Sequence, residues 1–380
     1  MGDILIIGGG FAGQEAARFF ARNRYGIGQR QVIVVDAKSA FDFLPLLPDV
    51  AGGRIAAKNA TVSFQDYFGR LNINFQQDKV VRIDVKTKDV FLETGRRLSY
   101  EYLLLAAGSV TNYYSQEFLR SKSFELKTVS DVLKLAKAVE DNPDKKILIV
   151  GGGYTGVEIA SNLALFLRRR KVKKYHIHII ERNEDLLSSL PVWMQDYCRL
   201  NLCAYRVNVH CAVSIKEVTD CCVKLSNNIE FDNYLLVWTA GVAAPPFTSS
   251  LEVKKDRLGR LFVDEHMKVT NYCYAAGDLT CFQYANKPIR MAVQFSVAQG
   301  RIAAKNILRS ITGRKLLKYR PCDSGFLVPL ANKKACGKVL FFRVFGIFGW
   351  FLHYGMCIYR SSTIKNRFGV FCDIFLKMGR

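Results

Sequence analysis

Short apolar runs alternate with glycine-rich turns and helical patterns along most of the chain. Residues 3–7 are apolar and β-branched, which predicts a strand buried on both faces, and residues 14–24 predict a helix of good helix formers. Residues 31–36 predict a second buried strand, which ends in Asp36. This order of elements predicts an α/β fold whose parallel sheet begins at the start of the chain.

Three glycines with the spacing G-x-G-x-x-G separate the first strand from the first helix: Gly8, Gly10 and Gly13. Gly8 makes the tight turn, Gly10 lets the backbone approach a pyrophosphate, and Gly13 lets the helix pack against the strand. The free N–H groups of the helix then face the phosphates, and Asp36 stands about where a ribose 2′-hydroxyl needs an acceptor. The stretch predicts a dinucleotide site, and the alternative is a glycine-rich turn without a ligand.

An internal repeat strengthens this prediction. Residues 146–161 repeat the opening stretch almost position for position, and the next predicted strand, residues 175–181, again ends in a carboxylate. The glycines of the repeat are Gly151, Gly153 and Gly156, and its carboxylate is Glu181. Two complete units predict two similar Rossmann-like domains, each binding one dinucleotide.

The remaining predicted strands place the second domain inside the first. Residues 235–241 mirror residues 102–108 and mark the end of the second unit. A strand at 271–278 and a helix at 291–308 then return the chain to the first domain. The predicted first domain comprises residues 1–112 and 242–320, and the predicted second domain comprises residues 113–241.

Three connecting segments have their own patterns. Residues 41–53 are an apolar stretch with two prolines, which we interpret as a covering loop that is neither regular helix nor strand. Residues 79–85 and 88–92 alternate like a small hairpin. We interpret residues 111–114 as a crossing point between the domains.

Length and composition set the broad class. A chain of 380 residues with 49% apolar residues predicts a globular protein of two or three domains. The net charge of +22 predicts attraction to nucleic acid, anionic lipid or an anionic substrate. Because the first strand begins at residue 3, we expect no signal or transit peptide and a cytoplasmic compartment. The 11 Cys are then expected to be reduced thiols, and no metal site is expected.

The C-terminal region, residues 321–380, carries an unusual apolar pattern. Residues 339–359 contain only Arg343 and His353 as chargeable side chains, but an arginine and three glycines disfavour a spanning helix. Phe368, Phe371, Phe375 and Met378 follow at helical spacing, flanked by Lys365, Arg367, Lys377 and Arg380. This pattern predicts a helix pair lying in an anionic membrane interface. The alternatives are a helix pair that completes the core and a homodimer contact.

Two dinucleotide sites without a separate substrate domain indicate one tightly held flavin and one nicotinamide that enters and leaves. Asp278, which follows Gly277, supports a flavin in the first domain. A carboxylate beside a helix start can hold a ribityl hydroxyl while backbone N–H groups meet the pyrophosphate. These residues therefore predict an oxidoreductase.

The full set of motifs resembles the two-dinucleotide-binding flavoproteins, and most closely the type II NADH dehydrogenases. The matching stretches are residues 7–13, 43–48, 106–114, 151–158, 276–278 and the helix start at Gln294. The resemblance implies a single-chain enzyme that transfers a hydride from NADH to FAD and electrons to a membrane quinone without pumping protons. It also implies a peripheral membrane protein on the cytoplasmic face of the cell membrane.

The resemblance further implies roles for individual residues. FAD would be bound by Gly8, Gly10, Phe11, Ala12, Gly13, Asp36, Val80, Ala107, Gly108 and Asp278. NADH would be bound by Gly151, Gly153, Tyr154, Thr155, Gly156, Glu181 and Gly241, and Glu181 would repel the 2′-phosphate of NADPH. Glu158 would be the catalytic residue near the nicotinamide, and the alternative is an acid that stabilises the helix dipole. Gln294 and Ala298 would line the quinone pocket.

The quinone pocket is also where the chain departs from the family pattern. The family usually shows a second Gln four residues after the first, whereas this chain has Ala298 at that position. Gln299 is one residue further on and so about 100° round the helix. NADH as the donor is therefore better supported than quinone as the acceptor.

Other functions have weaker support. Residues 1–197 contain no Cys, which excludes the disulfide reductases that carry a Cys-x4-Cys pair beside the flavin, and Cys198 and Cys203 are interpreted as a buried structural pair. A sulfide:quinone oxidoreductase, with Cys281 and Cys322 as candidate cysteines, is the closest enzyme alternative. A signalling flavoprotein similar to apoptosis-inducing factor is the other, but no aromatic-basic motif supports nucleic-acid binding.

Overall fold

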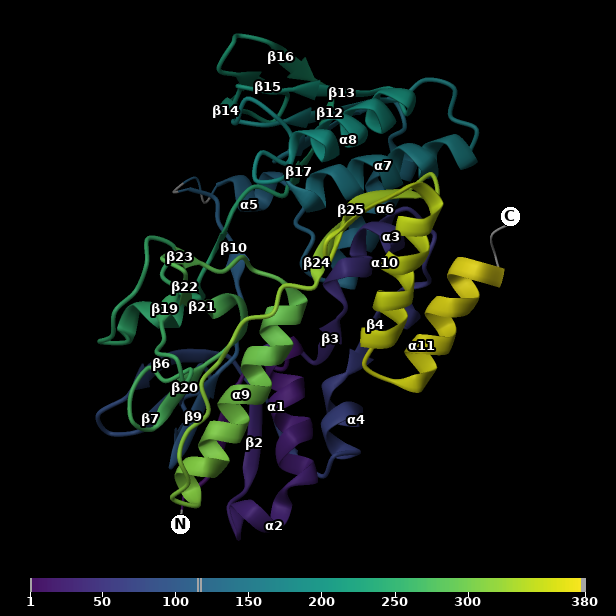
Figure 1. The fold of residues 1–380 in the computed structure, drawn as a ribbon. Helices are drawn as coiled ribbons and strands as arrows, with labels where there is room; N and C mark the ends of the chain where they lie inside the picture. Colours follow the sequence, from purple (N-terminus) through teal and green to yellow (C-terminus); the bar gives the residue numbers. More distant parts are fainter. Residues whose placement is uncertain (1, 115, 117, 377–380) are drawn as a thin grey trace. The chain divides into compact units, whose positions relative to one another are not determined.

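The computed structural model describes residues 2–114, 116 and 118–376, and its contacts divide the chain into two compact units (Figure 1). The first unit comprises residues 1–41, 63–110 and 242–323. The second unit comprises residues 42–62, 111–241 and 324–380. The chain passes between the units at β3 (Ala40–Asp42), β4 (Thr61–Ser63), β10 (Val110–Thr111) and β18 (Val242–Ala243), and again between residues 323 and 324.

A five-stranded parallel sheet with the order β20-β9-β1-β2-β5 organises the first unit. Its strands are β1 (Ile4–Ile7), β2 (Val32–Asp36), β5 (Asn74–Gln77), β9 (Tyr102–Leu105) and β20 (Cys273–Ala275). The central strands β1 and β9 are buried at every position, as expected for strands covered on both faces.

Two long helices of the first unit, α1 (Phe11–Arg22) and α9 (Val293–Ile311), lie side by side in Figure 1. Their close approach depends on Gly300, because a Cβ there would lie 2.3 Å from the carbonyl oxygen of Ala12. The sequence prediction of both helices is confirmed, with ends shifted by a few residues.

Smaller elements complete the first unit. The predicted hairpin is present as two strands of a three-stranded antiparallel sheet, β6 (Val80–Asp84), β7 (Asp89–Leu92) and β8 (Arg97–Ser99). The short helices are α2 (Arg24–Ile27), α4 (Phe64–Gly69), η3 (Pro246–Ser250) and η4 (Gly277–Leu279). The short strands are β19 (Leu261–Phe262), β21 (Thr280–Cys281), β22 (Gln283–Tyr284) and β23 (Lys287–Pro288).

The second unit repeats the parallel arrangement with four strands in the order β13-β12-β11-β17. These are β11 (Lys146–Val150), β12 (His176–Ile180), β13 (Val207–His210) and β17 (Tyr234–Trp238). A three-stranded antiparallel sheet of β14 (Ile215–Val218), β15 (Cys222–Leu225) and β16 (Glu230–Asp232) packs into the same core. The helices of this part are α5 (Leu119–Lys122), α6 (Val129–Asp141), α7 (Tyr154–Arg169) and α8 (Val192–Ala204).

The apolar stretch 41–53 is helical over much of its length, which corrects the prediction of an irregular loop. It forms η1 (Leu44–Leu46) and α3 (Leu47–Ala51), and η2 (Ala57–Asn59) follows. Pro48 lies in the first turn of α3, where the missing N–H removes no helical hydrogen bond. α3 packs on α6 and α7, so these residues group with the second unit and not with the predicted first domain.

The C-terminal region is also different from the predicted helical tail. It begins with an antiparallel sheet of β24 (Gly325–Leu330), β25 (Lys334–Val339) and β26 (Phe342–Phe345). The helices α10 (Gly346–Arg360) and α11 (Ile364–Phe371) and the π-helix η5 (Cys372–Leu376) follow. Lys377, Met378 and Arg380, which belong to the predicted apolar stripe and its flanks, lie outside the described residues.

This C-terminal region packs firmly into the second unit. Trp350 and Tyr354 on the inner face of α10 are fully buried, and β24 and β25 contact α7 and α8. Sequence periodicity missed the sheet because its strands alternate only weakly between apolar and polar positions. Within the described part of the chain, no helix combines the length and the hydropathy needed to cross a membrane.

Candidate active site

The first glycine loop joins β1 to α1 and leaves open space at its centre. Gly8 has a φ of +105°, and a Cβ on Gly13 would lie only 1.9 Å from the carbonyl oxygen of Gly8. A Cβ on Gly10 would meet no atom within 4 Å. Gly8 and Gly13 are therefore required by the turn itself, whereas Gly10 borders space that a ligand can enter.

Asp36 lies beside this loop, although it is 26 positions beyond Gly10 in the sequence. Its carboxylate accepts a hydrogen bond of 2.7 Å from the backbone N–H of Gly9 and one of 2.9 Å from the N–H of Lys38. The end of β2 is thus held against the start of α1. This is the position that binding of an adenosine ribose requires.

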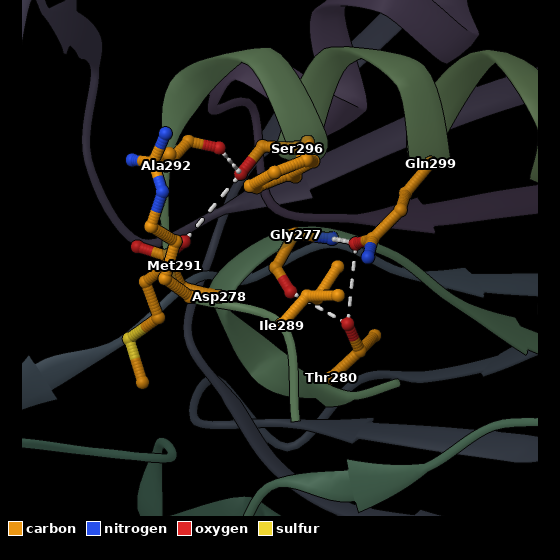
Figure 2. A pocket seen from close by; sticks show the side chains of 10 residues that line it. Gly277, Asp278, Thr280, Ile289, Met291, Ala292, Ser296 and Gln299 are labelled. Carbon is orange, nitrogen blue, oxygen red and sulfur yellow. Dashed lines mark hydrogen bonds between the residues drawn. The ribbon is translucent and has the colours of Figure 1, made fainter. Parts of the chain in front are cut away.

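A pocket in the first unit is formed by η4 and the first turns of α9 (Figure 2). The hydroxyl of Ser296 lies 3.5 Å from a carboxylate oxygen of Asp278 and 3.3 Å from the carbonyl oxygen of Ala292, and its one hydrogen is available to either acceptor. Asp278 therefore lines a hollow next to the N-terminal end of α9. The carboxylate of Asp278 thus lies beside a helix N-terminus, which is the environment that the predicted ribityl site requires.

Gln299 has a structural role in the same pocket, where its side chain holds a backbone turn. Its side-chain oxygen accepts hydrogen bonds from the N–H of Gly277 at 2.7 Å and from the hydroxyl of Thr280 at 3.1 Å, as Figure 2 shows. The side chain is buried and fixes the Gly277–Asp278 turn. Gln299 therefore does not take the place of the glutamine that the family pattern would have at position 298.

The other residues predicted to bind FAD are distributed over the first unit. Phe11 and Ala12 form the first turn of α1, where the ring of Phe11 packs edge-on against Phe41 with centroids 5.0 Å apart. Val80 begins β6, and Ala107 and Gly108 are the second and third residues after β9. Gly108 has a φ of +67°, and a Cβ there would meet no atom within 4 Å.

The second glycine loop, between β11 and α7, has the same geometry as the first. Gly151 has a φ of +105°, and a Cβ on Gly156 would lie 1.9 Å from the carbonyl oxygen of Gly151. A Cβ on Gly153 would meet no atom within 4 Å. The repeat seen in the sequence is thus a repeat of backbone conformation, with open space at the same position.

Glu181 holds this second loop as Asp36 holds the first. Its carboxylate accepts a hydrogen bond of 2.6 Å from the N–H of Gly152 and one of 2.8 Å from the N–H of Asn183. Tyr154 and Thr155 begin α7. Gly241 has a φ of +76° beyond the end of β17, and a Cβ there would lie 2.4 Å from the hydroxyl of Tyr114.

Glu158 lies in the second turn of α7, not in the first, so the helix dipole gives its carboxylate little stabilisation. Burial raises the pKa of Glu158 well above its usual value, and the nearby carboxyl of Asp49 adds to this effect. A carboxyl group with this environment keeps a proton at a higher pH than an exposed glutamate does. Such a group is suited to donating a proton.

A buried ionic cluster beside Glu158 was missed by the sequence analysis. Asp49 accepts hydrogen bonds from Arg54 at 3.0 Å and from the hydroxyl of Tyr354 at 2.7 Å. Arg54 also donates to the side chain of Asn162 at 3.3 Å, and Asn162 donates to the carbonyl oxygen of Glu158. The only signal was a pair of charged residues flanking an apolar stretch, and their partner Tyr354 is 305 positions from Asp49.

The predicted quinone residues lie on one face of α9. Gln294 is in the first turn and donates to the carboxylate of Asp323 at 2.9 Å, and Arg290 donates to the same carboxylate at 2.8 Å. Ala298 follows one turn later and is half-buried. The structure thus places Gln294 and Ala298 together, with a polar side chain only at the first position.

The cysteines do not form a reactive pair at the pocket. Cys198 is buried with its sulfur 3.5 Å from that of Cys336, whereas Cys203 is exposed, so the predicted buried pair of Cys198 and Cys203 is wrong. Five positions on a helix turn the side chain through about 140°, which puts the two on different faces of α8. Neither Cys281 nor Cys322 lines the pocket of Figure 2, and burial raises the pKa of the Cys281 thiol. Among the described residues, no three His, Cys, Asp or Glu side chains gather as metal ligands would.

Comparisons with known proteins agree with this geometry. Residues 2–300 match the family model described as pyridine nucleotide-disulphide oxidoreductase. Demethylphylloquinone reductase NdbB of Synechocystis is 26% identical over 97% of this chain and 94% of its own length. Type II NADH:quinone oxidoreductase of Haemophilus influenzae is 25% identical over 89% of this chain and 87% of its own.

Solved structures show the same fold. NDH2 from Plasmodium falciparum in complex with NADH superposes with a TM-score of 0.86 at 18% identity, covering 100% of this chain and 99% of that one. The predicted α/β fold is therefore confirmed, and the two Rossmann-like domains agree with it. The predicted resemblance to type II NADH dehydrogenases is confirmed as well.

Proposed function

Because the chain belongs to the pyridine nucleotide-disulphide oxidoreductase family, we propose that it is an FAD-dependent enzyme that oxidises NADH and reduces a membrane quinone without pumping protons. The repeated glycine loop carries this proposal, since Gly10 and Gly153 border open space in identical turns. Bound FAD supplies the redox chemistry, taking a hydride from NADH and returning electrons to the acceptor. The two relatives whose names contain a quinone reaction support the choice of acceptor.

The first unit provides the groups that FAD requires. Gly10 leaves room for the pyrophosphate at the start of α1, and Asp36 offers a carboxylate at the adjacent strand end for the adenosine ribose. Asp278 lines the pocket at the start of α9, where it would hold the ribityl chain. We therefore assign FAD to the first unit.

The second unit provides the matching groups for NADH. Gly153 leaves the corresponding room, and Glu181 is a buried carboxylate that is already hydrogen-bonded to the loop. A ribose 2′-hydroxyl can donate to this carboxylate, whereas a 2′-phosphate would be repelled by it. The site therefore selects NADH over NADPH.

We expect NADH to reduce the flavin faster than NADPH does. Glu181→Gln should lower the ratio of these two rates about tenfold, which corresponds to about 1.4 kcal/mol. Glutamine keeps an oxygen that can accept the hydrogen bond from Gly152 but removes the negative charge. Stopped-flow loss of flavin absorbance with each nucleotide measures the effect. Glu184→Gln, three residues on and exposed, is the matched control. Equal rates with both nucleotides in the unchanged protein would contradict the assignment of Glu181.

We assign a proton-transfer role during turnover to Glu158, because its buried carboxyl is suited to holding and releasing a proton. Its raised pKa keeps the carboxyl protonated to a higher pH, and Asp49, fixed by Arg54 and Tyr354, maintains the negative field that opposes ionisation. As the pH rises through this pKa, the proton is lost and donation stops. The acceptor pocket itself is assigned to the first unit, where Gln294 and Ala298 would line it.

Glu158→Gln should slow quinone reduction by at least about tenfold while changing flavin reduction by NADH less than about twofold. Glutamine resembles the protonated acid in shape but releases no proton. The wild-type rate of quinone reduction should fall as the pH rises through the pKa of Glu158, and the variant should lose this dependence. Single-turnover reoxidation of the reduced protein by a short-chain quinone, followed against pH, measures both. An unchanged pH profile in the variant would assign the proton to another group.

The C-terminal region of the second unit has the surface expected of a membrane contact. Its apolar side chains that are more than half exposed are Leu340, Phe341, Phe342, Ile347, Phe348, Tyr359, Ile364, Phe368 and Leu376. Exposed Arg343 and Lys365 lie among them in the sequence. Such an apolar surface edged by cations fits the interface of an anionic bilayer. These side chains support a peripheral membrane protein that a lipid-soluble quinone can reach, and the proposal of the cytoplasmic face of the cell membrane rests on the family resemblance alone.

Replacing Phe341 and Phe348 together by Ser should weaken binding to anionic vesicles at least about tenfold, since each exposed phenylalanine contributes about 1.5–3 kcal/mol when it enters an apolar phase. Turnover with NADH and a water-soluble quinone should be unchanged. Vesicle flotation and a parallel turnover assay give the two readouts, with exposed Tyr25→Ser in the first unit as the control. Removing the whole region is unsuitable, because Trp350 and Tyr354 belong to the core.

A further inference from the structure

One face of α8 carries apolar side chains that the second unit covers only in part. Trp193, Tyr197 and Leu200 stand at positions i, i+4 and i+7 and so lie on one face of the helix. Leu200 is 71% exposed, and both aromatic side chains are half-buried. Asp196 is exposed about 60° round the helix from Trp193 and marks the border of this face.

The same face of α8 is continuous with β26. The ring of Phe345 lies 4.7 Å from that of Trp193 and 5.8 Å from that of Tyr197, measured between centroids. The guanidinium of Arg343 lies over the Trp193 ring at 5.4 Å. We call Trp193, Tyr197, Leu200, Arg343 and Phe345 the α8–β26 patch. The patch therefore joins a helix of the nucleotide-binding sheet to the apolar C-terminal surface.

The charge on the hairpin next to the patch points to an anionic partner. Lys338 of β25 stands directly opposite Arg343 of β26 in the antiparallel register, and Lys334 lies on the same strand. All three side chains are exposed. Like charges in directly opposed positions repel each other, so a negatively charged surface would relieve an unfavourable pair. A two-fold contact with a second copy would instead bring another pair of cations to the same place.

We propose that the α8–β26 patch contacts the headgroup region of an anionic bilayer, so that the NADH-binding domain touches the membrane through α8 as well as through the C-terminal region. This inference rests on the proposed function and extends it to a helix outside that region. Trp and Tyr favour the depth where headgroups meet acyl chains, because each ring has an apolar body and one polar group. Arg343 and Lys338 then face the lipid phosphates.

Tryptophan fluorescence tests the contact directly. The chain has three Trp, and Trp238 and Trp350 are 6% and 1% exposed, so Trp193 is the one able to meet lipid. Anionic vesicles that contain brominated phospholipid should quench the emission of the full-length protein. Trp193→Phe should remove at least half of this quenching, and rising salt should reduce what the unchanged protein shows.

A second variant tests the patch without changing the fluorophore. Leu200→Glu places a negative charge in the patch and should weaken vesicle flotation at least fivefold, whereas Leu133→Glu, an exposed leucine on α6, should not. Turnover of both variants with NADH and a water-soluble quinone should equal that of the wild type. That turnover assay tests the enzymatic proposal independently of the membrane contact.

The possible outcomes separate the proposals. Loss of quenching in Trp193→Phe together with weaker flotation of Leu200→Glu supports the α8 contact. If only the Phe341 and Phe348 replacement weakens flotation, the membrane proposal stands and the α8 contact is overturned. If no variant changes flotation, both membrane proposals fail. A dimer seen by light scattering that Leu200→Glu dissociates would assign the patch to a second copy and overturn the lipid contact.

Discussion

A Gly10→Val variant should purify as a folded protein that no longer retains FAD. The backbone at Gly10 is extended, with φ −70° and ψ −165°, which a valine adopts without strain. Its Cβ would meet no protein atom within 4 Å, so we expect the valine variant to keep the same fold. The new side chain instead fills the space in front of α1 that the pyrophosphate needs. We expect affinity for FAD to fall at least about a hundredfold, or about 2.7 kcal/mol.

The ratio of flavin to protein absorbance in the purified variant measures this loss, and thermal unfolding of the apoprotein checks the fold. Gly69→Val is a matched control, because a Cβ at Gly69 on α4 also meets no atom within 4 Å. The control should keep its yellow colour. A fully yellow Gly10→Val protein would show that the first glycine loop does not hold the flavin.

The equivalent change in the second loop should give the opposite phenotype. Gly153→Val should retain FAD and lose reduction by NADH, because Gly153 has the same extended backbone, with φ −77° and ψ −169°, and the same open space beyond its Cα. The pyrophosphate of NADH would meet the valine side chain. The rate of flavin reduction at limiting NADH should fall at least about a hundredfold, again about 2.7 kcal/mol in transition-state binding.

Anaerobic mixing with NADH, followed at the flavin absorbance maximum, measures the rate. Chemical reduction with dithionite provides the internal control, since it bypasses the nucleotide site and should proceed as in the unchanged protein. The pair of valine variants therefore separates the two dinucleotide sites. If Gly153→Val loses its flavin, the second loop and not the first binds FAD. If NADH reduces that variant rapidly, the second loop does not bind the pyrophosphate of NADH.

The elements around both sites could be predicted from the sequence because their causes are local. A buried strand, a turn that needs glycine at fixed positions and a helix that starts directly after it are recognisable within about 20 residues. Gly8 and Gly151 have the same φ of +105°, and Asp36 and Glu181 bind the backbone of their own loops. Two copies of this unit were enough to indicate two nucleotides and the order of the domains.

Only the tertiary structure shows which residues from distant segments of the chain contact one another. Asp49 and Tyr354 meet from opposite ends of the chain, and the resulting buried cluster gives Glu158 its surroundings. The side chain of Gln299 accepts hydrogen bonds from Gly277 and Thr280. Its position in the sequence did not show whether this side chain would face that turn or the predicted quinone pocket.

The C-terminal region illustrates the same limit. Its aromatic residues predicted a helix pair lying in a membrane interface, but the inner face of α10 belongs to the core and only the outer side chains are exposed. Trp193 of α8 joins the exposed aromatic surface through Phe345, 152 positions later in the sequence. Periodicity along one segment shows that a side is apolar. Whether that side meets protein or lipid depends on the other segments packed against it, which the local pattern does not contain.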